Sequence, residues 1–319
     1  MPSEFELIAR HFTRPLRHTV LGVGDDGAVV RPATGMDLVV STDMLVSGTH
    51  FLPDADPEAL GWKCLAVNLS DLAAMGAEPR WAVVAAALPE ADEAWIAAFA
   101  RGLFACADAF AVDVIGGDTT RGPLNLAPTV FGEVPQEQAL TRAGARAGDD
   151  LWVSGTPGLA ALGLNHRLGK VSLPDTAAAR CLAALDRPQP RVGLGIALRG
   201  LATAAIDVSD GLLADIGHVL ERSALAADVA FDLLPRAALD TGTPAELARQ
   251  CLLGGGDDYE LAFSAPPERR ADIGALAAPL GLPLTRIGTL RDGTAGELIL
   301  RDASGRSMPL PPRGFDHFA

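Results

Sequence analysis

The sequence predicts a two-domain protein of the α/β or α+β class. Strand-like runs alternate with helical patterns through both halves of the 319-residue chain, as expected for layers of helices and sheet. Hydrophobic residues make up 49% of the chain, which is enough to build two cores. A turn region with Gly and Arg at 142–150 separates the halves, so we expect domains at 1–145 and 146–319.

In the first half, capping signals mark the helices. Ser3-x-x-Glu6 is a capping box, and Asp56-Pro57 places a proline in the first turn of a long helix. We expect helices at 3–12, 57–75 and 92–110, and strands at 37–41, 81–88, 112–115 and 124–133.

The second half continues the alternation of strands and helices. It begins with a strand directly after the boundary turn, at 151–154. We expect further strands at 204–208, 227–232, 259–264, 284–290 and 297–301, and helices from 157 and at 175–185, 190–200, 211–223 and 267–279.

Composition argues against several classes of protein. The formal net charge is −14 without a basic patch, so no nucleic-acid partner is expected. The four cysteines are far apart and lie in apolar contexts, which is typical of buried thiols and not of a zinc or disulfide site. The N-terminus lacks a signal-peptide pattern, and the longest apolar run, Trp81–Leu88, is too short to span a membrane. We therefore expect a soluble cytoplasmic protein.

The motifs of the commonest nucleotide-binding proteins are missing. The sequence has no Gly-x-x-x-x-Gly-Lys-Ser/Thr and no His-Arg-Asp or Asp-Phe-Gly, so it is neither a P-loop protein nor a protein kinase.

Short acidic motifs are found instead where the predicted strands end. Such ends are where α/β proteins bind ligands, and Mg²⁺ prefers carboxylate and other oxygen ligands. Burying so many acids would require cations, which favours a metal site. The motifs are Gly24–Asp26, Ser41–Asp43, Asn68–Asp71, Gly116–Thr120, Asp207–Gly211 and Gly255–Tyr259.

Each motif also has a structural interpretation. The Gly24–Gly27 stretch is a common turn, and Asp43 can cap a helix. Asp71, inside a predicted helix, is either a metal ligand or a member of a polar pair. Capping explains only one of Asp207 and Asp210.

Taken in order, the motifs resemble those of the thiamine-monophosphate kinase family over nearly the whole chain. The most specific stretches are Ser41–Leu45, Gly48–Phe51, Trp62–Gly76, Gly116–Gly122, Asp207–Leu212 and Gly314–Phe318. That family shares a superfamily with aminoimidazole ribonucleotide synthetase and selenophosphate synthetase. The resemblance implies an N-terminal α/β domain that binds ATP and Mg²⁺ and forms a sheet or barrel across a homodimer, followed by a C-terminal α/β domain.

The resemblance also implies roles for individual residues. The implied contacts to ATP are Gly117, Asp118, Arg142 and Ser209. The implied contacts to thiamine monophosphate are His50, Asp257 and Phe315. The implied ligands of several Mg²⁺ ions are Asp26, Ser41, Thr42, Asp43, Asp71, Asp118, Asp207 and Asp210.

Some of these positions depart from the family pattern. The family usually has Glu where this chain has Asp257, one methylene shorter, and Trp or Tyr in place of Phe315. Ala100 replaces a ring-bearing residue that can pack near ATP. By position alone, His50 is either a substrate contact or a structural histidine, and Phe315 either an aromatic face for thiamine or a core residue.

The implied reaction is in-line transfer of the γ-phosphoryl group of ATP to the phosphate of thiamine monophosphate. A phosphate with a second pKa of about 6 is largely dianionic at neutral pH, so no catalytic acid or base is expected. Positioning and charge neutralisation by Mg²⁺ then carry catalysis, and Arg142 offers a fork for phosphate oxygens.

Two alternatives remain. One is a sister synthetase of the superfamily acting on another small substrate. Selenophosphate synthetase would need a reactive N-terminal Cys, but the first one here is Cys64, and the Gly314–Phe318 ending disfavours aminoimidazole ribonucleotide synthetase. The other is a non-catalytic protein that binds nucleotide or metal, which the near-complete set of acids disfavours.

Overall fold

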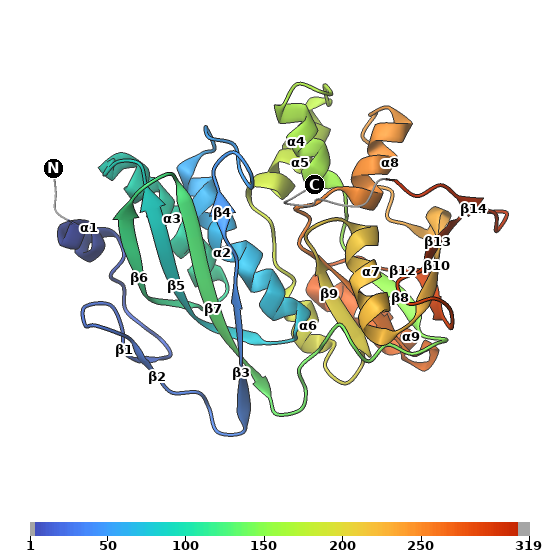
Figure 1. Ribbon diagram of the computed structural model, residues 1–319, viewed down its shortest axis with the longest axis horizontal. Helices are drawn as coiled ribbons and strands as arrows, with labels where there is room; N and C mark the ends of the chain where they lie inside the picture. Colours follow the sequence, from blue (N-terminus) through green and yellow to red (C-terminus); the bar gives the residue numbers. More distant parts are fainter. Residues whose placement is uncertain (1–3, 312–319) are drawn as a thin grey trace. The chain divides into compact units, whose positions relative to one another are not determined.

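The computed structural model describes residues 4–311 and forms two compact units (Figure 1). The first unit takes in the chain up to Leu72 together with Ala77–Glu137. The second takes in Ala73–Gly76 and the chain from Gln138 onward. The expected capping residue Ser3 lies outside the described residues.

The first unit is built on one mixed sheet. Its strands lie in the order β3 (Met36–Thr42), β7 (Asn125–Pro135), β5 (Glu78–Leu88) and β6 (Asp113–Arg121), with β4 (Leu45–Val46) also paired to β7. The β5–β6 pair is parallel and the other pairs are antiparallel. A separate small hairpin joins β1 (Thr19–Leu21) to β2 (Val29–Val30).

Helices cover only one face of this sheet, so its strands alternate between buried and exposed residues. The helices of the unit are α1 (Glu4–His11), α2 (Pro57–Ala74) and α3 (Glu93–Ala109), and Figure 1 shows α2 and α3 on the same side of the sheet. In β3, Val39 is 7% exposed, whereas its neighbours Leu38 and Val40 are 42% and 53% exposed. The second face of the sheet therefore carries apolar side chains at the surface.

The second unit has a larger sheet with helices packed against it. The strand order is β14 (Ser307–Met308), β13 (Leu298–Arg301), β10 (Ala226–Ala230), β12 (Leu284–Arg291), β8 (Asp150–Ser154), β11 (Glu260–Ala265) and β9 (Ala204–Val208). Its α-helices are α4 (Leu159–Arg167), α5 (Asp175–Asp186), α6 (Val192–Ala197), α7 (Leu212–Ser223), α8 (Ala245–Gly254) and α9 (Arg270–Leu280). Apolar side chains from β8, β9, α4 and α7 share one buried cluster, so this unit has its own core.

The expected fold class of mixed helices and sheets is confirmed, but some elements differ. β6 was expected to stop before Gly116-Gly117, whereas it runs on to Arg121. It continues because Asp118–Arg121 pair with Ala85–Leu88 of β5, and this pairing overrides the local break that glycines favour. Helix α8 and the short strands β1, β2, β4 and β14 were not expected.

The four cysteines are free and buried, as expected. Burial raises the pKa of the Cys64 thiol, and it raises that of Cys251 to about 11. None of the helices in the described part of the chain has the length and apolar character needed to cross a membrane.

Candidate functional site

Four polar residues meet where the end of β3 lies against helix α2. The Ser41 hydroxyl donates to Asp71 Oδ2 over 2.5 Å, and the backbone N–H of Asp43 donates to Asn68 Oδ1 over 2.9 Å. Asn68 and Asp71 lie almost one turn apart in α2, so they point to the same side of that helix. We call Ser41, Asp43, Asn68 and Asp71 the β3–α2 corner. It brings three predicted metal ligands, Ser41, Asp43 and Asp71, into one region.

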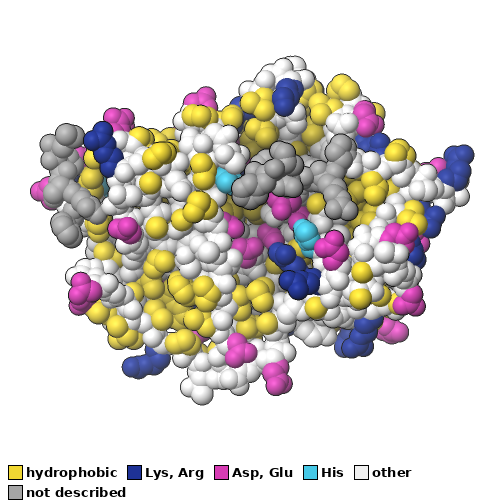
Figure 2. All heavy atoms as spheres, in the orientation of Figure 1, with side chains coloured by type: hydrophobic (Ala, Val, Ile, Leu, Met, Phe, Trp, Pro, Cys, Tyr) yellow, Lys and Arg dark blue, Asp and Glu magenta, His cyan; other side chains and the backbone are white. Residues whose placement is uncertain are grey.

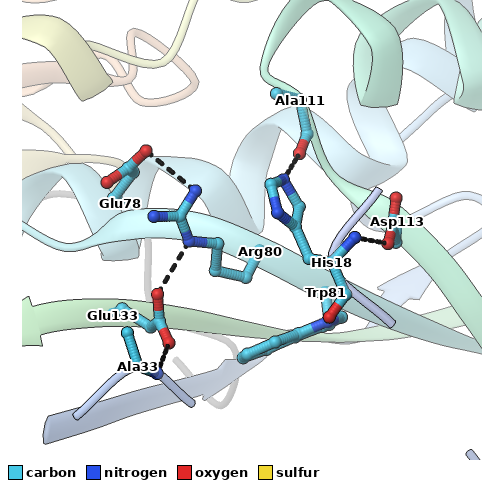
Figure 3. A network of polar contacts seen from close by, with 8 residues as sticks. All are labelled: His18, Ala33, Glu78, Arg80, Trp81, Ala111, Asp113 and Glu133. Atoms are coloured by element: carbon cyan, nitrogen blue, oxygen red, sulfur yellow. Dashed lines mark hydrogen bonds and ion pairs between the residues drawn. The ribbon is translucent and has the colours of Figure 1, made fainter. Parts of the chain in front are cut away.

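The loop that carries Asp26 is anchored at both ends (Figure 3). Before the loop, Asp113 accepts hydrogen bonds from the backbone N–H groups of Arg17 and His18. After it, Glu133 accepts from the backbone N–H of Ala33 over 2.6 Å. Asp26 itself is exposed between these anchors. Both anchoring carboxylates are buried, at 2% and 4% exposure, so the ends of the loop are held by the core of the unit.

The anchoring acids are themselves held by neighbours. Burial alone would raise the pKa of Asp113, but its bonds to His18, Arg17 and the Thr19 hydroxyl outweigh burial and lower it. Arg80 bridges Glu133 and Glu78, as Figure 3 shows.

His50 lies in a turn just after β4 and is half-buried. Its Nδ1 accepts the backbone N–H of Val46 over 3.0 Å. In the neutral ring the proton is then on Nε2, so Nε2 is the atom that can donate to a substrate. The structure thus assigns His50 a structural bond through Nδ1.

Gly117 and Asp118 lie inside β6, at the edge of the sheet opposite β3. A side chain at Gly117 would place Cβ 2.0 Å from the Val84 carbonyl oxygen, so close strand approach requires glycine there. Three strand spacings separate β6 from β3, which is roughly 14 Å. The sheet of the first unit therefore does not bring Asp118 against the β3–α2 corner.

In the second unit, the Ser209–Gly211 loop is organised by a residue that the sequence analysis overlooked. Asp215 Oδ2 lies 3.0 Å from the backbone nitrogen of Ser209 and 3.1 Å from those of Asp210 and Gly211. Burial and the nearby Asp210 charge raise the pKa of Asp215 to about 6. An Asp in the first turn of a helix was the available signal, because such acids often reach back to free N–H groups.

The segment at Asp257 lies directly beside this loop. The Asp257 N–H donates to the Ser209 carbonyl over 2.9 Å, and the Tyr259 N–H donates to the Val208 carbonyl over 2.8 Å. The Tyr259 hydroxyl donates to Asp257 Oδ1 over 3.0 Å. Both residues have positive φ values, 69° and 51°, which is uncommon for residues with a side chain. Two predicted motifs, distant in sequence, thus form one surface.

Asp258 and Glu260, in and directly after the same segment, anchor it through buried contacts. Gly158 N–H donates to Asp258 over 2.7 Å, and burial raises the pKa of Asp258 well above its usual range. The buried Glu260 accepts both from Arg191, through two 2.6 Å bonds, and from the Ser154 hydroxyl. Together with the bond from the Thr156 N–H to Glu260, these contacts hold the 155–158 turn.

The expectation of a buried acidic cluster is wrong for several residues. Asp26, Asp43 and Asp118 are exposed, so their charges are not buried. Of the predicted acidic ligands, Asp207 is buried, at 4% exposure. Across residues 4–311, no three His, Cys, Asp or Glu side chains gather closely enough to hold a metal ion.

The donors of the β3–α2 corner nevertheless suit Mg²⁺ chemically. They are carboxylate and hydroxyl oxygens, and Mg²⁺ commonly takes one or two carboxylates while water and substrate phosphates complete its shell. A partial site of this kind fits an ion that arrives with a nucleotide.

The remaining predicted residues make other contacts or lie outside the described residues. Arg142 is exposed in the turn before β8, and its carbonyl accepts from the Ser223 hydroxyl over 3.2 Å. Thr42 is exposed, and its hydroxyl donates to the Pro128 carbonyl. Phe315 lies outside the described residues.

Comparison with known proteins first defines the class. Residues 24–134 match the family of AIR synthase related proteins, N-terminal domain. The structure resembles that of hydrogenase maturation protein HypE, with a TM-score of 0.77 at 20% identity over 98% of this chain and 96% of the other, a likeness that concerns the fold alone. Residues 24–134, which lie in the first unit apart from Ala73–Gly76, thus form a domain of the AIR synthase-related class.

Closer relatives then define the family. The chain is 44% identical over 322 residues to thiamine-monophosphate kinase of Escherichia coli K12, covering 99% of this chain and 98% of that one. It resembles the crystal structure of thiamine-monophosphate kinase from Stenotrophomonas maltophilia K279a, with a TM-score of 0.84 and 46% identity over 95% of this chain and 96% of the other. It also resembles AaThiL complexed with AMPPCP and TMP, with a TM-score of 0.77 and 30% identity over 93% and 92% of the two chains. The chain belongs to the thiamine-monophosphate kinase family, and it is an enzyme of the phosphotransferase class.

Proposed function

We propose that the protein uses ATP and Mg²⁺ to convert thiamine monophosphate into thiamine diphosphate in the cytoplasm. The β3–α2 corner is the observation that carries this proposal, because it places Ser41, Asp43 and Asp71 together at the end of a strand. A relative with the same fold binds AMPPCP and TMP, which supports the choice of substrates.

In the proposed reaction, the residues position phosphates and no side chain moves a proton. Ser41, Asp43 and Asp71, with Asp26 and Thr42, would hold Mg²⁺ in the first unit; Asp207 and Asp210 would do so in the second. Asp118, on β6, would be a further Mg²⁺ ligand. Bound Mg²⁺ supplies positive charge that offsets the repulsion between two polyanions.

The proposed ATP contacts are the residues that the family resemblance implies. Gly117 would contact ATP through its backbone, on the edge strand β6. Ser209 would do so from a loop that Asp215 holds in place. The planar guanidinium of Arg142 would bind phosphate oxygens. His50 Nε2 and Asp257 would contact thiamine monophosphate, with Phe315 as an aromatic face. The first unit would also form the interface of the homodimer.

The homodimer proposal rests on the exposed face of the first sheet. Figure 2 shows hydrophobic side chains gathered over this sheet, and Leu38, Val40 and Met44 are 42%, 53% and 56% exposed. An apolar strand surface of this kind is costly to leave in water and is suited to a second copy of the chain.

The test is an assay with purified protein, ATP, Mg²⁺ and thiamine monophosphate. We expect thiamine diphosphate and ADP in equal amounts, and none when ATP or Mg²⁺ is omitted. A direct in-line transfer predicts inversion at a chiral γ-phosphorus, whereas a phosphoenzyme intermediate predicts retention. Absence of product from protein that still binds ATP would refute the kinase activity and favour a sister substrate.

A further inference from the structure

Asp215 is a buried carboxylate whose side chain bonds to a loop that carries predicted ligands. It is 3% exposed in the first turn of α7, and a single oxygen, Oδ2, accepts three consecutive backbone N–H groups. A negative charge there is also favoured by the N-terminal end of the helix dipole. Three donors that converge on one oxygen leave the backbone of Ser209–Gly211 little freedom.

The loop is also packed closely on its other sides. A Cβ on Gly256 would lie 2.5 Å from the Ser209 carbonyl oxygen, and one on Gly211 would lie 2.8 Å from the carbonyl carbon of Gly254. The Ser209 carbonyl accepts the Asp257 N–H, so the position of the loop determines the position of the second segment. Displacing Ser209 would therefore displace Asp257 as well.

We propose that Asp215 is a positioning residue for nucleotide and metal binding. It touches neither ligand itself but sets the backbone from which Ser209, Asp210 and Asp257 reach their ligands. This inference rests on the proposed function of those three residues. Groups that orient ligands in this way typically change metal affinity or activity about 10- to 100-fold when removed.

The test measures Mg²⁺-dependent binding of the non-hydrolysable analogue AMPPCP by calorimetry, so it does not need turnover. Asp215→Leu keeps a similar volume and removes the acceptor, and we expect the Mg²⁺ concentration for half-maximal binding to rise about 10- to 100-fold. Asp215→Asn keeps one acceptor oxygen, and we expect a smaller rise because neutral hydrogen bonds are weaker than charge-assisted ones.

Asp150→Asn is the matched control. Asp150 is a buried carboxylate of the same unit, 1% exposed, and its partners are Arg270 and Arg286. It pairs with the far end of β11, away from Asp257. We expect this variant to melt at a lower temperature without a change in Mg²⁺ dependence.

Each outcome of the AMPPCP binding experiment either supports or overturns the proposal. The proposal is overturned if folded Asp215→Leu binds the analogue with the wild-type Mg²⁺ dependence, or if Asp215→Asn does so where the Leu variant does not fold. It is also overturned if Asp150→Asn shifts the dependence equally. Wild-type protein that binds the analogue but makes no thiamine diphosphate would refute the kinase activity and leave the role of Asp215 measurable.

Discussion

The Ser41 hydroxyl lies 2.5 Å from a carboxylate oxygen of Asp71, which joins the end of a strand to the middle of a helix. The sequence allowed Asp71 to be either a metal ligand or a member of a polar pair. The structure shows that Asp71 forms a polar pair with Ser41. Because a carboxylate has two oxygens with several acceptor positions, the pair leaves Asp71 able to take a cation as well.

Replacing Asp71 tests its metal role. We expect Asp71→Asn to reduce turnover by more than the roughly 10- to 100-fold that is typical when a group that only orients a metal ligand is lost. The variant lacks the charge that would bind Mg²⁺ but keeps an acceptor for Ser41. The melting temperature should change little. Asp37→Asn, at an exposed position of β3, the strand that carries Ser41, is the control and should retain full activity. Substantial activity in folded Asp71→Asn would remove Asp71 from the proposed metal site.

Tyr259 provides a test of the substrate site. We expect Tyr259→Phe to raise KM for thiamine monophosphate by up to about tenfold, because the hydroxyl that holds Asp257 is lost. Asp257→Ala should raise it further. KM for ATP, measured with the same preparations, is the internal control. Equal increases in both KM values would contradict a specific role for Asp257 in binding thiamine monophosphate.

The pKa of Asp113 predicts a pH-dependent contribution to stability. Since its hydrogen bonds lower this pKa in the folded state, the stabilisation is fully present above the ordinary pKa of 3.8 and is lost as pH falls through the lower folded-state value. We expect Asp113→Asn to reduce the free energy of unfolding at pH 7 by about 2 kcal/mol. The difference from wild type should shrink below about pH 4. Denaturant melts between pH 3 and pH 7, as approximate limits, would measure it, and a constant difference would contradict the assignment.

The adjacent glycines Gly116 and Gly117 test whether β6 requires glycine because of close packing. Gly117→Ala should lower the free energy of unfolding by about 1–3 kcal/mol, because its Cβ would collide with the Val84 carbonyl. Gly116→Ala is the control, since its Cβ meets only a Val83 methyl carbon at 3.9 Å. Thermal melts of both variants would show whether the loss is confined to Gly117.

A charge on the exposed sheet face tests the homodimer. We expect Leu38→Asp to shift the protein from dimer to monomer in sedimentation experiments, because a carboxylate would have to be buried at the interface. Leu233, 45% exposed in the second unit, offers the control Leu233→Asp, which should leave the dimer intact. A wild-type monomer at micromolar concentration would contradict the proposal directly.

The sequence alone determined the elements whose signals are local. The Asp56-Pro57 cap and the apolar run of α2, the strand at 204–208 and the buried contexts of the cysteines required no tertiary information. The ordered acidic motifs were enough to indicate the family, because a family pattern is a property of the chain.

Tertiary structure decided which of those motifs meet. Pairing with β5 extended β6 beyond its glycines, and this pairing places Asp118 at the far edge of the sheet from Ser41. The first-turn position of Asp215 indicates a bond to free N–H groups, but not that one oxygen accepts three of them. The contact between Ser209 and Asp257 likewise depends on how the backbone turns in space. Residue types specify which bonds are chemically possible, and only the packed chain brings a donor within about 3 Å of its acceptor.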